Sequence, residues 1–341
     1  MEGPRVCVVG DSLPAPPRRL VPEQGLLRSA GRPSTRKTER MAYDVADLRS
    51  QLTPATARAA PGVAAAPQYF EFDDLAPDEV SEAGTTTWFV RSQNCCVAYS
   101  VVQAGDRLVR SGQPDEYMVL FPAADASAAV SAGDERRDVV GTTVAIVPPG
   151  SSEIEMSTTG VVVRVFSNAS ADLLARCRNA DTFVEPDPNV APFEPWPEPP
   201  AGYAIRIYPI AEVPDDPARF GRIFRCSSLM VNYLDPTDGP RDPAKLSPHH
   251  HDDFEQISLQ VDGDYVHHMR TPWTVNMADW RDDEHMRCAS PAVVVIPPPL
   301  VHTSEAVDDM WHQLVDIFCP PRLDFSQRPG WVLNHDEYPM P

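Results

Sequence analysis

A group of histidine and acidic residues in the last third of the chain has the types and spacing of a metal site. His249 and His251 are two residues apart, so their side chains share one face if the segment is a β-strand. Glu255 stays on that face if the strand continues unbroken, and His302 can supply a fourth ligand from a neighbouring strand. Imidazole and carboxylate ligands suit Fe(II), Mn(II), Ni(II) or Zn(II). A solvated histidine run or an affinity tag is the alternative, but neither would place Glu255 and His302 at this spacing.

The elements that must position these residues are short runs rich in β-branched and aromatic residues, separated by Gly, Pro, Asp or Ser. Regular short strands of this kind are typical of a sandwich or barrel. We expect strands near 85–91, 96–102, 117–121, 142–147 and 160–166, and then near 204–208, 229–234, 254–261, 264–269, 292–296 and 313–318. One short helix is expected near 171–177.

The strands fall into two units that look like repeats. Residues 144–149 parallel 293–298, and residues 115–120 parallel 253–258. We expect a tail and linker over 1–67, a first unit over 68–180, a Pro-rich linker over 181–202 and a second unit over 203–341. The tail is rich in Pro, Arg and Ser and is expected to be disordered. Its first 40 residues can also be read as an extension from a misplaced start codon.

The pattern His-x-His-x-x-x-Glu, followed by His302 after the Pro-rich turn 297–299, resembles the two metal motifs of the cupin superfamily. The resemblance implies an all-β chain with two cupin-type β-barrels in tandem, a bicupin, whose metal ligands are His249, His251, Glu255 and His302. The glycines of the family pattern are missing or displaced, and Pro299 and Ala306 replace its usual Gly and Asn. These departures affect turns rather than ligands.

The first unit lacks the ligands, since no histidine precedes Ser247. Ser111 and Gln113 stand near the two histidine positions, Glu116 or Tyr117 near the Glu position, and Glu153 near the late histidine. We therefore expect a degenerate first barrel with a structural role, and one metal ion in the second barrel.

A mononuclear non-haem enzyme is the first functional hypothesis, with Fe(II) as the favoured metal and a dioxygenase reaction on a small chelating acid, phenol or diketone. Mn(II), Ni(II) or Zn(II) would serve the alternative, an isomerase, decarboxylase or cyclase acting on a sugar or polyketide-like substrate. A non-catalytic binding bicupin is the third hypothesis. In the enzyme, Glu255 is expected to be a ligand or a catalytic base.

Four further residues are predicted to contact the substrate. His312 lies in the last expected strand, and His267 is one of two adjacent histidines whose side chains alternate in direction. Arg270 and Trp273 belong to a long excursion between the two metal motifs. This excursion is either a lid over the barrel mouth or a surface segment.

The composition narrows the classes of partner. The 341 residues carry a net charge of −20 with a pI near 4.7, which argues against binding to nucleic acids and anionic membranes. The seven cysteines show no zinc or disulfide spacing, and no run of 18 apolar residues occurs. We expect a cytoplasmic protein with a small-molecule substrate, and a homodimer is plausible.

Overall fold

The computed structural model describes residues 63–341, so most of the predicted tail lies outside the described residues. The described residues belong to one compact unit, in which short antiparallel strands form four sheets. The expectation of an all-β chain is confirmed.

The first barrel consists of a seven-stranded and a four-stranded sheet. The larger sheet contains, in spatial order, β12 (Arg206–Pro209), β9 (Thr143–Val147), β6 (Tyr117–Phe121), β11 (Gly160–Ser167), β4 (Cys95–Val102), β3 (Thr86–Arg91) and β2 (Glu79–Val80). The smaller sheet contains β5 (Arg107–Gln113), β10 (Gly150–Met156), β7 (Ser127–Ala132) and β8 (Glu135–Val140).

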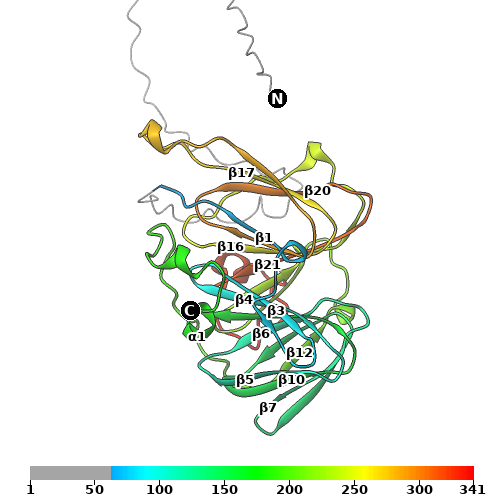
Figure 1. Ribbon diagram of the computed structural model, residues 1–341. Helices are drawn as coiled ribbons and strands as arrows, with labels where there is room; N and C mark the ends of the chain where they lie inside the picture. The colour runs from blue at the N-terminus through cyan, green and yellow to red at the C-terminus, as the bar shows by residue number, and fades with distance from the viewer. Residues whose placement is uncertain (1–62) are drawn as a thin grey trace, which may run out of the picture. The chain divides into compact units, whose positions relative to one another are not determined.

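The second barrel consists of a seven-stranded and a three-stranded sheet. The larger sheet contains β1 (Gln68–Glu71), β19 (Ala292–Ile296), β16 (Gln256–Asp262), β21 (Trp311–Phe318), β14 (Met230–Tyr233) and β13 (Arg222–Arg225), with β15 (Thr237–Asp238) paired to β21. The smaller sheet contains β18 (Glu284–Cys288), β17 (Tyr265–Arg270) and β20 (Val301–Ala306). Figure 1 shows the four sheets as successive layers, with β17 and β20 in one outer layer and β5, β10 and β7 in the other.

The two seven-stranded sheets pack against each other through one apolar core. Alternate residues of each strand point into it, as the period of two requires. From the first barrel these include Met118, Leu120 and Val163, and from the second Ile257, Leu259 and Val315. Both faces of the central strands are therefore buried.

The opposite faces of the two large sheets differ in polarity. In β6 the residues facing the inside of the first barrel are Tyr117, Val119 and Phe121, which belong to an apolar core shared with the four-stranded sheet. The equivalent strand β16 presents buried polar residues at alternate positions, namely Gln256, Ser258 and Gln260. The first barrel is filled by apolar side chains, whereas the second has a polar inner wall.

Each barrel lends one strand to the other. Strand β1 precedes the first barrel in the chain but pairs with β19 of the second. Strand β12 follows the predicted linker but pairs with β9 of the first. The domain boundaries at 68 and 203 remain a prediction, but strand pairing crosses both of them.

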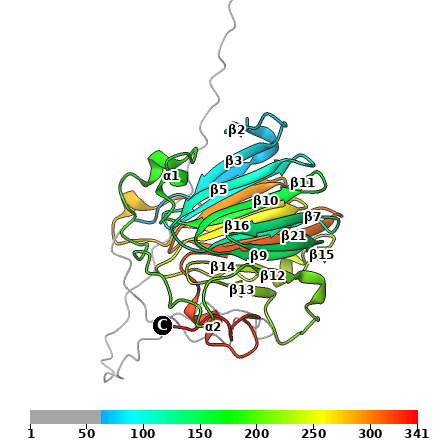
Figure 2. The same ribbon diagram turned by 90° about the horizontal axis from the view of Figure 1, so that it is seen from below.

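Two short α-helices complete the described chain, α1 (Ala171–Leu174) and α2 (Leu323–Ser326). The first lies within the helix expected near 171–177. Figure 2 shows α2 beside β13, and Phe325 of α2 shares an apolar cluster with Ile223 of β13. Within residues 63–341, no helix has the length and apolarity needed to cross a membrane.

Candidate metal centre

His249 and His302 are joined through their backbones. His249 N donates to His302 O at 3.0 Å and His302 N donates to His249 O at 2.7 Å, so the two residues form an isolated antiparallel bridge. The bridge brings the segment before β16 against the start of β20. It fixes both Cα positions next to each other, so the two imidazoles start from neighbouring points of the backbone.

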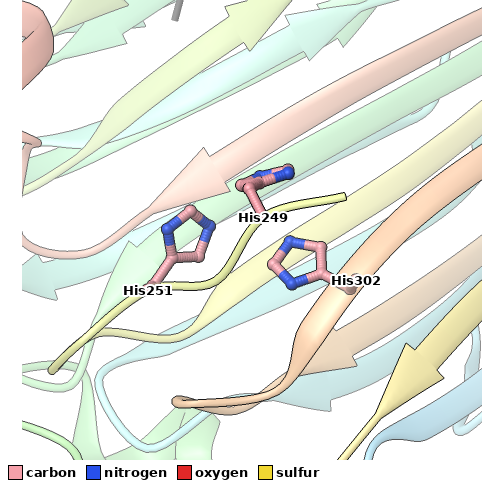
Figure 3. A group of neighbouring side chains, drawn as sticks. All are labelled: His249, His251 and His302. Atoms are coloured by element: carbon pink, nitrogen blue, oxygen red, sulfur yellow. The ribbon is translucent and has the colours of Figure 1, made fainter. Parts of the chain in front are cut away.

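The rings of His249, His251 and His302 converge, as Figure 3 shows. Each offers one nitrogen within 4.8 Å of the others, and all three residues are buried. Among the described residues, no other group of three or more His, Cys, Asp or Glu side chains meets this criterion. Three of the four predicted ligands are therefore together.

Backbone carbonyls set the tautomers of two of these rings. Nδ1 of His249 lies 3.1 Å from the carbonyl oxygen of Ser247, and Nδ1 of His302 lies 3.0 Å from that of Leu300. In each ring Nδ1–H donates to the carbonyl, which leaves the lone pair on Nε2. A carbonyl or carboxylate on the far nitrogen is the usual arrangement of a metal-binding histidine.

His251 is held by a glutamine and an aromatic ring. Its Nε2 lies 2.9 Å from Oε1 of Gln256, and its ring stacks on Phe254 with centroids 4.5 Å apart. Burial lowers the pKa of His251 well below its usual range. The imidazole is therefore neutral at physiological pH, the form in which histidine binds metals.

Glu255 is not part of this group, which corrects the expectation from sequence. The strand does not continue from His251 to Glu255, because β16 begins only at Gln256. In β16 the even-numbered residues face the barrel interior, so Gln256 and not Glu255 meets His251. The Glu255 carboxylate instead accepts from the backbone N–H of Gln93, in the first barrel, at 2.6 Å. Burial raises the pKa of Glu255 to about 7.

A buried polar network continues from Gln256 along the inner wall. Nε2 of Gln256 donates to Oγ of Ser258 and to Oδ1 of Asp316, each at 2.9 Å. Oγ of Ser258 also donates to Oδ1 of Asp316 at 3.0 Å. These donations orient the amide so that its oxygen faces His251. Asp316 is 8% exposed and places a carboxylate two hydrogen bonds from the histidine group.

The histidine group borders a cavity of about 490 Å³ inside the second barrel. Its lining includes His249, His302 and Gln256 at one part of the wall. Along β21 it includes His312, Leu314 and Asp316, which are two residues apart and so face the same side. His312 is buried, and its Nε2 lies 2.8 Å from Oδ1 of Asp308. The volume suits a small organic molecule.

Of the four residues predicted to contact a substrate, His312 lines this cavity. His267 is buried between Gln260 and Ser304, and burial lowers its pKa to about 3. Arg270 pairs with Asp283 on the surface, and Trp273 stacks on Trp280 with 73% of its surface exposed. These three do not line the cavity.

In the first barrel, polar side chains near the degenerate ligand positions bind one another. Gln113 accepts from Nε of Arg110 at 2.7 Å, and Arg110 also binds Asp172. Tyr117 exchanges a hydrogen bond with Ser152 at 2.8 Å. Ser111 is exposed, and Glu153 is paired with Arg107. The described part of this barrel thus has no room or ligand set resembling that of the second.

Gln256 and Asp316 line the cavity beside the histidines, and the sequence analysis did not single them out. A signal was present, because β16 reads Gln-Ile-Ser-Leu-Gln, with polar residues at every second position of a fully buried strand. The parallel strand β6, Tyr-Met-Val-Leu-Phe, has none. Alternation of this kind marks a polar interior face.

No family model matches the sequence, and no curated protein sequence matches it. Solved structures do resemble the fold. Oxalate decarboxylase from Lactobacillus farciminis, as its formate complex, is similar with a TM-score of 0.51 at 14% identity, covering 74% of this chain and 86% of that one. A mutant of Bacillus subtilis oxalate decarboxylase gives 0.50 at 12% identity, covering 76% and 81%. The chain therefore shares the two-barrel fold of these proteins.

Proposed function

We propose that the second barrel binds one divalent metal ion and is a mononuclear metal enzyme acting on a small, chelating organic molecule. The observation that carries the proposal is the convergence of three buried histidines, two of which, His249 and His302, line a cavity of about 490 Å³. The donor set fits a metal ion, because backbone carbonyls hold Nδ1 of His249 and of His302 and leave Nε2 of each ring as the donor.

His249, His251 and His302 would hold the ion, and we assign the fourth protein ligand to Oε1 of Gln256 rather than to Glu255. This oxygen lies 2.9 Å from Nε2 of His251. Adjacent ligands at about 2.1 Å from a metal in an octahedral shell are about 3 Å apart. Four neutral ligands would leave the full charge of the ion available to a substrate oxygen.

The bound metal would act as a Lewis acid and, as iron, as a one-electron centre. Imidazole nitrogens and an amide oxygen suit Fe(II), Mn(II), Ni(II) and Zn(II) alike. Of these four ions we favour Fe(II). The protein orients the substrate along the wall formed by β21.

The first candidate reaction is dioxygenation by an Fe(II) centre. The four protein ligands would leave two positions of a six-coordinate ion for a chelating substrate, and iron would supply the one-electron chemistry that a reaction with O2 requires. A hydroxy acid, phenol or diketone has the oxygen pair that such chelation requires.

The second candidate is decarboxylation, isomerisation or cyclisation without redox change, and Asp316 favours it. A buried carboxylate linked to the metal-facing amide by a 2.9 Å hydrogen bond can take a proton from a bound substrate and return it. The structural neighbours are named oxalate decarboxylases, so oxalate belongs among the compounds tested.

The experiment is metal analysis of the purified protein, followed by anaerobic Fe(II) or Mn(II) reconstitution and assays with catechols, hydroxy acids, diketones and oxalate. Close to one iron per chain with substrate-dependent O2 uptake would support the dioxygenase. Turnover without O2 uptake would support the second candidate. A protein that binds no divalent metal under any of these conditions would contradict the proposal and favour a binding bicupin.

A further inference from the structure

A second group of imidazole and carboxylate side chains lies on the outer face of the three-stranded sheet, away from the cavity. Nδ1 of His268 lies 2.7 Å from Nδ1 of His285, and the two rings are tilted by 65° with centroids 4.9 Å apart. Nε2 of His268 lies 2.9 Å from Oε2 of Glu305. The three residues come from β17, β18 and β20.

The strand register builds this arrangement. His268 is directly opposite His285 on β18, so the two side chains leave the same face of the sheet as a cross-strand pair. On its other side His268 is opposite Thr303 of β20, and Glu305 is two residues further along that strand. His267, the residue directly before His268, points to the opposite face and is buried. The alternation separates the two adjacent histidines into different environments.

The charges around this group favour a cation. Arg270 is bonded to Asp283, and Arg287 is bonded to Asp264 at 2.7 Å. Each neighbouring arginine is thus matched by its own aspartate. Glu305 adds a negative charge, and its carboxylate is hydrogen-bonded to the imidazole of His268. The local surface therefore has an acidic surplus next to two imidazoles.

We propose that His268 and His285 chelate a divalent transition-metal ion of the Zn(II), Ni(II) or Cu(II) class on this outer face. The carboxylate of Glu305 accepts from Nε2–H of His268, fixing its tautomer and making Nδ1 the better donor, as in carboxylate–histidine–metal units. Nδ1 of His268 and Nδ1 of His285 are 2.7 Å apart, near the separation of about 3 Å of two adjacent ligands.

The two imidazoles keep the same number of protons when the ion binds. Without metal, Nδ1–H of His285 donates to Nδ1 of His268. On chelation that proton moves to Nε2 of His285, and both Nδ1 lone pairs turn to the ion. Imidazole suits these three metals, and the remaining positions are filled by water. With two protein ligands, the site is weaker than the three-histidine centre.

The outer site lies on the same three-stranded sheet as His302, on the face directed away from the cavity. His268 is paired with Thr303, the residue after His302, and Met269 is paired with His302 itself. A metal bound to β17 and β18, with Glu305 of β20 as its supporting carboxylate, would join all three strands. The expected consequence is a small sheet that resists unfolding more strongly when the outer site is filled.

Zn(II) titration of the full chain, followed by competition with a chromophoric chelator, tests the proposal. We expect two ions per chain for the wild type, with His285→Ala retaining only the tighter one. Glu305→Gln should weaken the second ion about tenfold while leaving the first unchanged. His335→Ala is the matched control, because His335 is a surface imidazole beside an acid, 3.1 Å from Asp336.

This experiment tests the two proposed metal sites independently of each other. His302→Ala should lose the tighter ion and keep the outer one, so an error in the proposed function would not conceal the outer site. The inference is overturned if His285→Ala binds as many ions as the wild type. It is also overturned if His335→Ala weakens the second ion as much as His285→Ala does, since binding would then be adventitious.

Discussion

Glu116 and Glu255 occupy equivalent positions in the two barrels, each directly before the strand that pairs with the run ending in Pro-Pro. Tyr117 pairs with Val147, and Gln256 pairs with Ile296. Each carboxylate accepts a backbone N–H from the other barrel: Glu255 from Gln93 at 2.6 Å, and Glu116 from Ser227 at 3.3 Å. Burial raises the pKa of both. The barrels are thus joined by reciprocal carboxylate contacts, beside the reciprocal exchange of β1 and β12.

Glu255→Gln should change how stability depends on pH. Because the fold raises the pKa of Glu255 from 4.5 to about 7, it favours the neutral carboxyl. The stabilising contribution is complete below pH 4.5 and is lost as pH rises through 7. A shift of this size corresponds to about 3 kcal/mol. The amide stays neutral and keeps an oxygen for the N–H of Gln93.

Urea unfolding of the metal-free protein between pH 4 and 8 measures this effect. The variant should gain on the wild type as pH rises, and the gain should level off above pH 8. Parallel stability curves for the two proteins across this range would show that folding does not shift the pKa of Glu255.

His251→Ala and His302→Ala should each remove the metal from the second barrel and leave the barrels folded. The inter-barrel core does not contain these residues, so circular dichroism should be unchanged. Metal per chain, measured by inductively coupled plasma analysis after dialysis that removes the more weakly bound outer ion, should fall from about one to near zero. Ser111→Ala, at the degenerate position of the first barrel, is the control and should keep its metal; loss there would locate a site in the first barrel.

Gln256→Ala should weaken metal binding about tenfold, because it removes the proposed fourth ligand and the contact on His251. Gln260→Ala is a matched control: Gln260 is buried on the same face of β16 but contacts His267 instead. Competition with a chelator gives both affinities. Equal affinities for the two variants would exclude Gln256 as a ligand and leave a three-histidine site.

The sequence predicted the fold well because short runs with a period of two and a repeated Val-rich strand ending in Pro-Pro determine it. It also predicted that three histidines converge, since His249, His251 and His302 need only the return of β20 to meet. The expectation that Glu255 lies beside the histidines was wrong for a local reason. The segment between His251 and Gln256 is not a strand, so face parity could not be carried across it, and a shift of one residue exchanged Glu255 for Gln256.

The same shift affected the proposed repeat. Residues 115–120 were aligned with 253–258, whereas strand pairing aligns Tyr117 with Gln256, one residue later. The partner of Glu255 lies in a turn of the other barrel, 162 positions away in the chain, and no local pattern indicates such a contact. The sequence does not decide whether the excursion around Trp273 is a lid or a surface segment. In the structure Trp273 is exposed on the surface.

Gly263→Ala should destabilise the second barrel and disturb the cavity wall. Gly263 has φ of +82°, and a Cβ there would lie 2.3 Å from Cδ2 of His312 and 2.9 Å from the carbonyl oxygen of Trp311. Left-handed backbone alone costs about 1 kcal/mol for alanine. The clash with a buried ring and with the backbone raises the expected loss in unfolding free energy to about 3 kcal/mol.

Gly105→Ala separates the cost of the left-handed backbone from the cost of the clash with His312. Gly105 has φ of +83° but open space where the Cβ would lie, so its variant should lose only about 1 kcal/mol. Urea unfolding of the three proteins gives the difference, which measures how firmly His312 is held between Gly263 and Asp308. Equal losses for the two variants would mean that the ring moves aside at no cost. His312 would then be a mobile part of the cavity wall, and a poor candidate for fixing a substrate.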